Sequence, residues 1–187
     1  MKFGGLQKNS LIDFPNTLAC VVFTSGCNFI CPYCHNPELV AGSKKGAGNS
    51  ISEQEIFSFL EKRKGLIDGV VITGGEPTLH KKLLNFCKKV KGLGYKIKLD
   101  SNGTNPQMLS FLFENRLIDF ISMDIKTSLD RYHLAAGKKF GHTLAATLTE
   151  SINLVMTEAP DYEFRTTCIR PFTSEDIIKS IGEMIKG

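Results

Sequence analysis

The feature that most constrains the fold is a strand–loop–helix pattern that recurs along the chain. Apolar, β-branched segments that predict buried strands lie at residues 18–24, 69–73, 95–100, 119–126 and 162–170. Each is followed by turn residues and then by apolar residues at helical spacing. Such alternation predicts parallel strands joined by right-handed helical crossovers.

Capping residues support several of the intervening helices. Ser52 and Glu55 have the spacing of a capping box, Asn105 precedes Pro106 as N-cap and first helical residue, and Ser174 precedes a final helix. Apolar spacing alone predicts two more helices, at about residues 79–90 and 142–156. The segment 41–50, rich in Gly, Ser and Lys, is predicted to be a loop.

The chain length selects among the folds that share this pattern. An eight-fold β/α barrel needs about 250 residues, and this chain has 187. We therefore predict a single α/β domain over residues 1–187, a partial, open parallel β/α barrel of five or six β/α units. A doubly wound open sheet is the alternative. In both folds the functional loops lie at the C-terminal ends of the strands.

Composition and charge indicate a soluble cytoplasmic protein. Hydrophobic residues make up 42% of the chain, charged residues 22%, and the net charge of +4 is only mildly basic. The N-terminus has no secretory signal, and the apolar run at residues 18–23 is too short for a bilayer. We expect neither a nucleic acid nor a membrane as partner. In the reducing cytoplasm, clustered cysteines indicate a metal or redox site rather than disulfides.

Cys27, Cys31 and Cys34 form such a cluster, with spacing CxxxCxxC, in the loop after the first predicted strand. Structural zinc prefers four closed ligands, which the adjacent His35 could complete only with strained geometry. A 4Fe–4S cluster on three thiolates keeps one iron open for a chelating substrate. We favour this catalytic cluster; a non-catalytic zinc or iron–sulfur binding module is an alternative. The remaining cysteines, Cys20, Cys87 and Cys168, are predicted to be small buried residues.

Three further predicted strands end in unusual loops, GGEP at 74–77, DSNGT at 100–104 and MDIK at 123–126. Because the C-terminal ends of parallel strands share one edge of a sheet, we expect these loops to join the cysteines in one site. Gly74 and Gly75 allow close approach of the backbone to a ligand, and a carbonyl or Glu76 can accept a hydrogen bond from an ammonium group.

This combination resembles the radical S-adenosylmethionine (radical SAM) enzymes, in which an aromatic residue, here Tyr33, precedes the third cysteine. Residues 5–40, together with GGEPTL, DSNGT and MDIK, are more closely similar to the activating enzymes of glycyl-radical enzymes. Within that group the resemblance is strongest to the activase of anaerobic ribonucleoside-triphosphate reductase, and it extends over essentially the whole chain.

The resemblance implies a chemistry and its partners. Cys27, Cys31 and Cys34 would hold the 4Fe–4S cluster, and SAM would chelate the open iron. Reductive cleavage of SAM would give a 5′-deoxyadenosyl radical that abstracts a glycine Cα hydrogen from a partner enzyme. The implied partner is anaerobic ribonucleotide reductase, with another glycyl-radical enzyme, such as pyruvate formate-lyase, as the alternative. A flavodoxin- or ferredoxin-type protein would supply the electron.

The resemblance also assigns residues. The SAM contacts that it implies are Tyr33, Asn36, Gly74, Gly75, Glu76, Ser101, Asn102, Lys126, Arg165 and Thr167. It further implies a monovalent cation beside SAM, at Asp100, Met123 and Asp124. Each of these residues could instead have a purely structural role. Each aspartate could be a helix N-cap, Lys126 could be a solvent-exposed side chain, and Tyr33 could simply pack beside the cysteines. Partial barrels of this family have six strands, so we expect the final strand to be absent from this chain.

Overall fold

A computed structural model describes residues 1–40, 51–137 and 143–186. The predicted loop at 41–50 and the predicted helix start at His142 lie outside these residues. The strands are β1 (Phe3–Ser10), β2 (Ala19–Thr24), β3 (Gly69–Gly74), β4 (Lys96–Ser101), β5 (Phe120–Asp124) and β6 (Tyr162–Arg165). The helices are α1 (Pro37–Val40), α2 (Glu53–Lys62), α3 (Leu83–Gly92), α4 (Pro106–Glu114), α5 (Tyr132–Ala136), α6 (Thr143–Glu158) and α7 (Glu175–Met184), with 3₁₀ turns η1 (Pro77–Leu79) and η2 (Leu129–Arg131).

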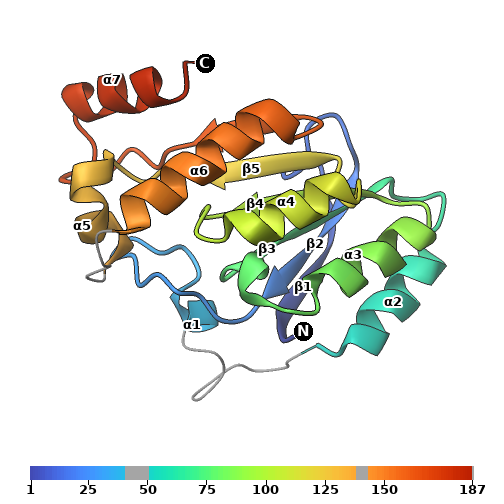
Figure 1. The fold of residues 1–187 in the computed structure, drawn as a ribbon. Coiled ribbons are helices and arrows are strands. Elements are labelled where there is room, and N and C mark those ends of the chain that lie inside the picture. Colours follow the sequence, from blue (N-terminus) through green and yellow to red (C-terminus); the bar gives the residue numbers. More distant parts are fainter. Residues whose placement is uncertain (41–50, 138–142, 187) are drawn as a thin grey trace.

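The strands form one sheet in the order β1-β2-β3-β4-β5-β6, in which only β1 is antiparallel to its neighbour (Figure 1). Helices α2, α3, α4 and α6 cover one side of this sheet (Figure 1). A doubly wound sheet would carry helices on both faces. The observed arrangement therefore confirms the predicted α/β fold and favours the open-barrel form.

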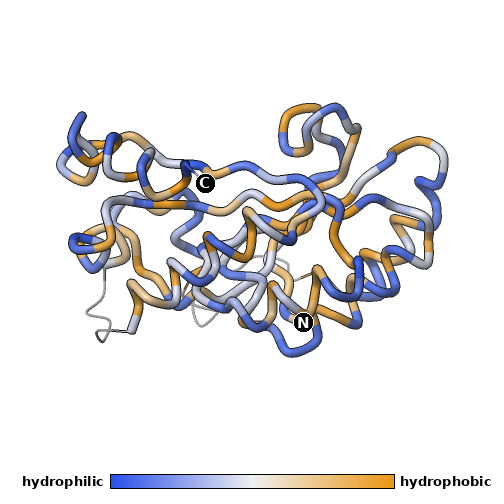
Figure 2. Tube along the Cα trace, turned by 45° about the horizontal axis from the view of Figure 1, so that its top comes forward, coloured by the Kyte–Doolittle hydropathy of each residue, from blue (hydrophilic) through white to orange (hydrophobic). Residues whose placement is uncertain are grey.

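Strand alternation separates two faces of the sheet. On the helix side, Val22, Ile72, Leu99 and Met123 belong to the main hydrophobic core together with residues of the helices. Figure 2 shows hydrophobic residues running along the strands and alternating with hydrophilic ones along the helices. This packing holds the strand ends, and hence the loops that follow them, in place.

The opposite, concave face is part apolar and part charged. The strand register aligns Val21, Val71, Lys98 and Phe120 in one row, and Asp100 pairs with Ser122 two residues further along β4. Residues 11–17 cover the lower end, where Phe14 is 5% exposed and packs on Phe120 with ring centroids 6.1 Å apart. The charged side chains of this face therefore lie between the apolar contact of Phe14 with Phe120 and the loops at the C-terminal ends of the strands.

The predicted helix caps are confirmed. Ser52 and Glu55 form both hydrogen bonds of a capping box. The side chain of Asn105 accepts from the amide of Met108, and that of Ser174 accepts from the amide of Ile177. These contacts satisfy amide groups that a helix start leaves without partners.

Several predicted boundaries were wrong. Strand β1 was not predicted, because FGGLQKNS lacks apolar alternation and becomes a strand only by pairing with β2. The predicted strand 162–170 ends at Arg165, and the polypeptide then leaves the sheet. Cys168 consequently lies exposed rather than buried, whereas Cys20 and Cys87 are buried as predicted. The predicted helix at 79–90 begins only at Leu83, after η1.

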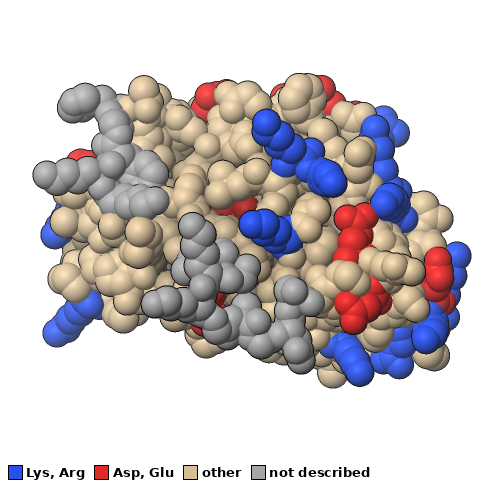
Figure 3. Space-filling model, turned by 90° about the horizontal axis from the view of Figure 1, so that it is seen from below, with Lys and Arg blue, Asp and Glu red and all other residues tan. Residues whose placement is uncertain are grey.

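On the face seen in Figure 3, Lys and Arg side chains are interspersed with Asp and Glu. Within the described residues, no helix combines the length and the apolar character needed to cross a bilayer.

Candidate functional site

A cavity of about 460 Å³ lies at the C-terminal ends of the parallel strands. The cysteine loop, GGEP, DSNGT, the end of β5 and the residues at the end of β6 all contribute to its wall. Every predicted site residue except Met123 lines it. The cavity also reaches His35, considered above only as a zinc ligand, and Phe29, Val40 and Thr73, which the sequence did not single out. The predicted convergence of four loops on one site is therefore present in the structure.

Met123 does not face this cavity. It is fully buried in the helix-side core, and its Sδ would lie 3.1 Å from a Cβ atom placed on Gly103. Strand alternation explains the difference, because Asp124 and Met123 are neighbours in β5 and point to opposite faces. The side chain of Met123 thus cannot act as a ligand in the cavity.

All six cysteines are free thiols, and Cys27, Cys31 and Cys34 are partly buried at the cavity wall. Burial raises the pKa of Cys27 to about 11 and also raises the pKa of Cys31. The amide of Phe29 donates to Sγ of Cys27 at 3.4 Å. Thiols in such a setting become thiolates when a metal displaces their protons.

The spacing of these thiols bears on the kind of metal. Over the described ranges 1–40, 51–137 and 143–186, no group of three His, Cys, Asp or Glu side chains is arranged to hold one metal ion. Zinc would draw its sulfur ligands to about 2.3 Å around a single point. An iron–sulfur cluster presents a separate iron to each thiolate, so its ligands stay apart. Three thiolates can hold such a cluster and leave one iron without a protein ligand.

The start of the cysteine loop is held against GGEP by backbone contacts. The amide of Glu76 donates to the carbonyl of Gly26 at 2.8 Å, and the amide of Gly75 donates to that of Thr24 at 2.8 Å. A Cβ atom on Gly75 would lie 2.1 Å from the Gly26 oxygen. Gly75 is therefore required for loop packing, in addition to any contact with a ligand.

The middle of the cysteine loop is held by α5. The amide of Ile30 donates to the carbonyl of Ala136 at 2.8 Å, and Phe29 packs on Tyr132 with ring centroids 6.1 Å apart. Gly137 follows with φ of 68°, and a Cβ atom there would lie 1.8 Å from the Ile30 oxygen. Sequence reasoning missed this contact, because a single glycine at the end of a short helix carries no distinctive signal.

Replacing Gly137 with alanine should therefore displace the cysteine loop. We expect the cluster to be retained about tenfold more weakly, the scale of effects that residues behind metal ligands commonly have. Iron per chain after anaerobic reconstitution and desalting measures this. Gly94→Ala is the matched control, because Gly94 also has positive φ, 92°, but no atom of the described residues lies within 4 Å of its Cβ position, its chain neighbours aside. Equal iron loss in both variants would assign the effect to backbone strain alone.

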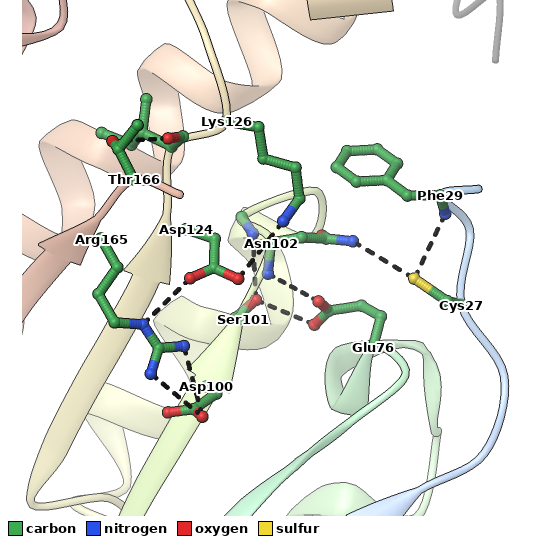
Figure 4. Close-up of polar contacts among 12 residues, drawn as sticks. Cys27, Phe29, Glu76, Asp100, Ser101, Asn102, Asp124, Lys126, Arg165 and Thr166 are labelled. Carbon is green, nitrogen blue, oxygen red and sulfur yellow. Dashed lines mark hydrogen bonds and ion pairs between the residues drawn. The ribbon is translucent and has the colours of Figure 1, made fainter. Parts of the chain in front are cut away.

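Glu76 joins the GGEP and DSNGT loops. Its side chain is 1% exposed and accepts from the amide of Thr78 at 3.1 Å and from the hydroxyl of Thr78 at 2.6 Å. It also accepts from the hydroxyl of Ser101 at 2.9 Å and from the amide of Asn102 at 2.7 Å (Figure 4). Burial raises the pKa of Glu76, and these hydrogen bonds oppose the rise. Since both oxygens are engaged by the protein, a backbone carbonyl of this loop is better placed than Glu76 to receive an ammonium group.

Asn102 extends this network toward the cysteines. Its Nδ2 donates to Oδ1 of Asn28 at 2.9 Å, and Nδ2 of Asn28 donates to the Thr104 hydroxyl at 2.8 Å. The same Nδ2 of Asn102 lies 4.0 Å from Sγ of Cys27 (Figure 4). Asn28, which was not predicted, therefore ties the cysteine loop to DSNGT.

A row of charged side chains forms the opposite wall (Figure 4). Nε of Arg165 lies 3.1 Å from Oδ1 of Asp124, and its Nη1 lies 3.4 Å from Oδ2 of Asp100. Nζ of Lys126 lies 3.4 Å from Oδ2 of Asp124. Neither aspartate caps a helix, and the side chain of Lys126 is only 16% exposed. The alternative roles, a helix N-cap for each aspartate and a solvent-exposed side chain for Lys126, are therefore wrong.

The charge of Lys126 is maintained by its surroundings. Burial alone would lower its pKa, but Asp124 and Cys31 outweigh burial and hold the pKa above its usual value. Lys126 is thus a cation at the cavity wall, able to meet an anionic ligand group.

Tyr33 has a polar atom without a partner. Its ring packs on Phe172 with centroids 5.2 Å apart, and its buried hydroxyl has no hydrogen-bond partner in the described part of the chain. Buried polar atoms are nearly always paired in folded proteins. Because Tyr33 lines the cavity, this hydroxyl fits a site built for a polar ligand.

The family is shown by sequence comparison. The sequence model of the Radical SAM superfamily matches residues 21–182. A proposed glycyl-radical enzyme activating enzyme of Methanocaldococcus jannaschii is 32% identical over 184 residues, which is 97% of this chain and 74% of that protein. The pyruvate formate-lyase-activating enzyme of Listeria monocytogenes is 34% identical over 126 residues, 61% of this chain and 49% of the Listeria enzyme.

Solved structures support the fold. TYW1 with a lysine–pyruvate adduct has a TM-score of 0.64 at 17% identity, over 90% of this chain and 60% of TYW1. SuiB of Streptococcus suis bound to S-adenosylmethionine has a TM-score of 0.63 at 16% identity, over 88% of this chain and 36% of SuiB. The radical SAM family uses a 4Fe–4S cluster and SAM, and the free thiols and polar cavity fit both. The chain belongs to the radical SAM superfamily and is homologous to glycyl-radical enzyme activating enzymes.

Proposed function

We propose that this protein is an activase that cleaves SAM reductively at a 4Fe–4S cluster and so generates a glycyl radical on a partner enzyme. The observation that carries the proposal is the convergence of three free thiols, GGEP, DSNGT and MDIK on one cavity. The 32% identity to the Methanocaldococcus protein over nearly the whole chain supports a glycyl-radical enzyme as the target.

In this proposal the chain's own residues bind and orient the reactants. Cys27, Cys31 and Cys34 hold the cluster. When bound, the cluster supplies one electron that breaks a sulfonium C–S bond of SAM, and the carbon radical so released removes a hydrogen atom from a glycine Cα of the partner. A flavodoxin- or ferredoxin-type protein would deliver that electron. The cavity walls would shield the reacting groups from bulk water.

The remaining cavity residues would position SAM. Backbone carbonyls of Gly74 and Gly75 would accept from its ammonium group, and Lys126 would meet its carboxylate. Tyr33 would lie beside the adenine. Further contacts are proposed at Asn36, Ser101, Asn102, Arg165 and Thr167.

We favour anaerobic ribonucleotide reductase as the partner, on the resemblance of residues 5–40 to its activase noted in the sequence analysis. Pyruvate formate-lyase is the second candidate, favoured by the 34% identity to the Listeria enzyme. A purely binding module accounts for the cysteines but gives no reason for the buried charges of the opposite wall.

The test uses the reconstituted protein, SAM and a chemical reductant with each candidate partner in turn. We expect a glycyl-radical EPR signal on the reductase and none when the partner's radical-bearing glycine is replaced with alanine. A signal on pyruvate formate-lyase instead would reassign the partner. SAM cleavage without a radical on either protein would contradict both assignments and indicate another target.

A further inference from the structure

We infer that Lys98 supplies a built-in cation to the carboxylates of this site, so that SAM binding needs no monovalent metal ion. The inference rests on SAM binding in this cavity and not on the identity of the glycyl-radical partner. It departs from the cation site that the resemblance implied at Asp100 and Asp124.

Lys98 is an unusual residue for its position. It lies in β4 with its side chain 3% exposed, in a row between Val71 and Phe120. Lysine is almost never fully buried unless it is paired. Its ammonium group here donates to the carbonyl of Asp13 at 2.5 Å and lies 5.7 Å from the centroid of the Phe120 ring. The segment of residues 11–17, which covers this part of the concave face, therefore helps to hold the ammonium group in place.

The same ammonium group faces two carboxylates. Its Nζ lies 3.4 Å from Oδ1 of Asp100 and 3.4 Å from Oε1 of Glu163. Oδ1 of Asp100 is buried and accepts no hydrogen bond from the residues that the structure describes, so Lys98 is its partner by charge. The other oxygen of Asp100 faces Arg165 at 3.4 Å. Both oxygens of Asp100 are thus matched by cationic side chains of the protein itself.

The charges on this face balance. Asp100, Asp124 and Glu163 give three negative charges, and Lys98, Lys126 and Arg165 give three positive ones. A sodium or potassium ion at the two aspartates would have to displace a cation from their oxygens and would leave the group with net positive charge. The described arrangement therefore does not fit an added monovalent cation.

Lys98 does not line the cavity, whereas Asp100 and Arg165 do. It is a positioning residue: it holds Asp100, and Asp100 with Asp124 holds the Arg165 guanidinium at the cavity wall. Removing one partner of a buried ion pair leaves an uncompensated charge. Without Lys98, Asp100 should take up a metal cation from solution instead.

The experiment measures the affinity of the reconstituted protein for SAM in potassium, sodium and tetramethylammonium chloride at one ionic strength. We expect the wild-type dissociation constant to change by less than about twofold. Lys98→Met should bind SAM about tenfold more weakly in tetramethylammonium, and potassium or sodium should restore binding. Lys96→Met is the control, since Lys96 lies in the same strand but is exposed.

The wild-type measurement is decisive even where Lys98→Met fails to fold. Loss of wild-type affinity in tetramethylammonium would overturn the inference, since the site would then require a small cation. Lys98→Gln keeps a hydrogen-bond donor beside Asp100 but removes the charge, and it gives a second route to the same test. A Lys98→Gln variant that binds SAM equally well in all three salts would also overturn the role of Lys98. SAM affinity is measured without any partner, so failure here is distinct from failure of the proposed function.

Discussion

Replacing Cys31 with alanine should abolish SAM cleavage and most iron binding while leaving the protein folded. Cys31 is the central thiol of the three and is only partly buried, so alanine leaves a small cavity. Its backbone contact, the Cys34 amide donating to the Cys31 carbonyl at 3.0 Å, is kept. Because a proposed ligand itself is removed, the loss should exceed the roughly 100-fold effect of changes behind metal ligands.

Three measurements check this prediction: iron per chain after reconstitution, the EPR signal of the reduced cluster, and 5′-deoxyadenosine formed from SAM and dithionite. Cys168→Ala is the matched control, because Cys168 is an exposed free thiol outside the cavity. It should behave as the wild type does. Retention of iron and of 5′-deoxyadenosine production in Cys31→Ala would reject the ligand assignment, and equal losses in both variants would point to general thiol damage.

Replacing Glu76 with alanine should lower the free energy of unfolding by at least about 3 kcal/mol, even without cluster or SAM. Hydrogen bonds to a charged group contribute about 1.5–3 kcal/mol each, and buried donors left unpaired are costly. The variant leaves the donors of Thr78, Ser101 and Asn102 without their shared acceptor. Glu76→Gln should lose less, because its amide oxygen still accepts while its NH₂ group opposes one donor.

Urea unfolding of the iron-free protein measures this effect. Glu61→Ala, an exposed change in α2, is the control and should stay within about 0.5 kcal/mol. The result separates two roles for Glu76. A residue that only contacts SAM would change SAM affinity with almost no change in unfolding of the iron-free protein. A residue that joins two loops changes both, so a loss of stability below about 1 kcal/mol would contradict the structural role.

Much of the site was predictable because its position follows from backbone geometry. The buried strands could be recognised from apolar runs, and the C-terminal ends of parallel strands share one edge of a sheet. The cysteine loop, GGEP and DSNGT therefore had to converge, whatever their side chains contact. The exception, Met123, also follows from strand alternation, since neighbouring residues of β5 cannot both face the cavity.

Lys98 shows what the same reasoning could not reach. In YKIKLD, Lys96 and Lys98 alternate with apolar residues, and this alternation predicts that both lysines are exposed to solvent. In the structure Lys96 is exposed and Lys98 is buried. The difference arises because residues 11–17, far away in the sequence, cover the lower part of the concave face.

The sequence by itself determined the fold class, the place of the three clustered cysteines and the loops that meet around them, because these depend on local periodicity and on spacing within short segments. Only the tertiary structure decided the pairing of β1, the hold of Gly137 on the cysteine loop and the partners of Glu76, Asp100 and Lys98. Those contacts join residues distant in the chain, and whether a polar group is paired depends on which distant group reaches it.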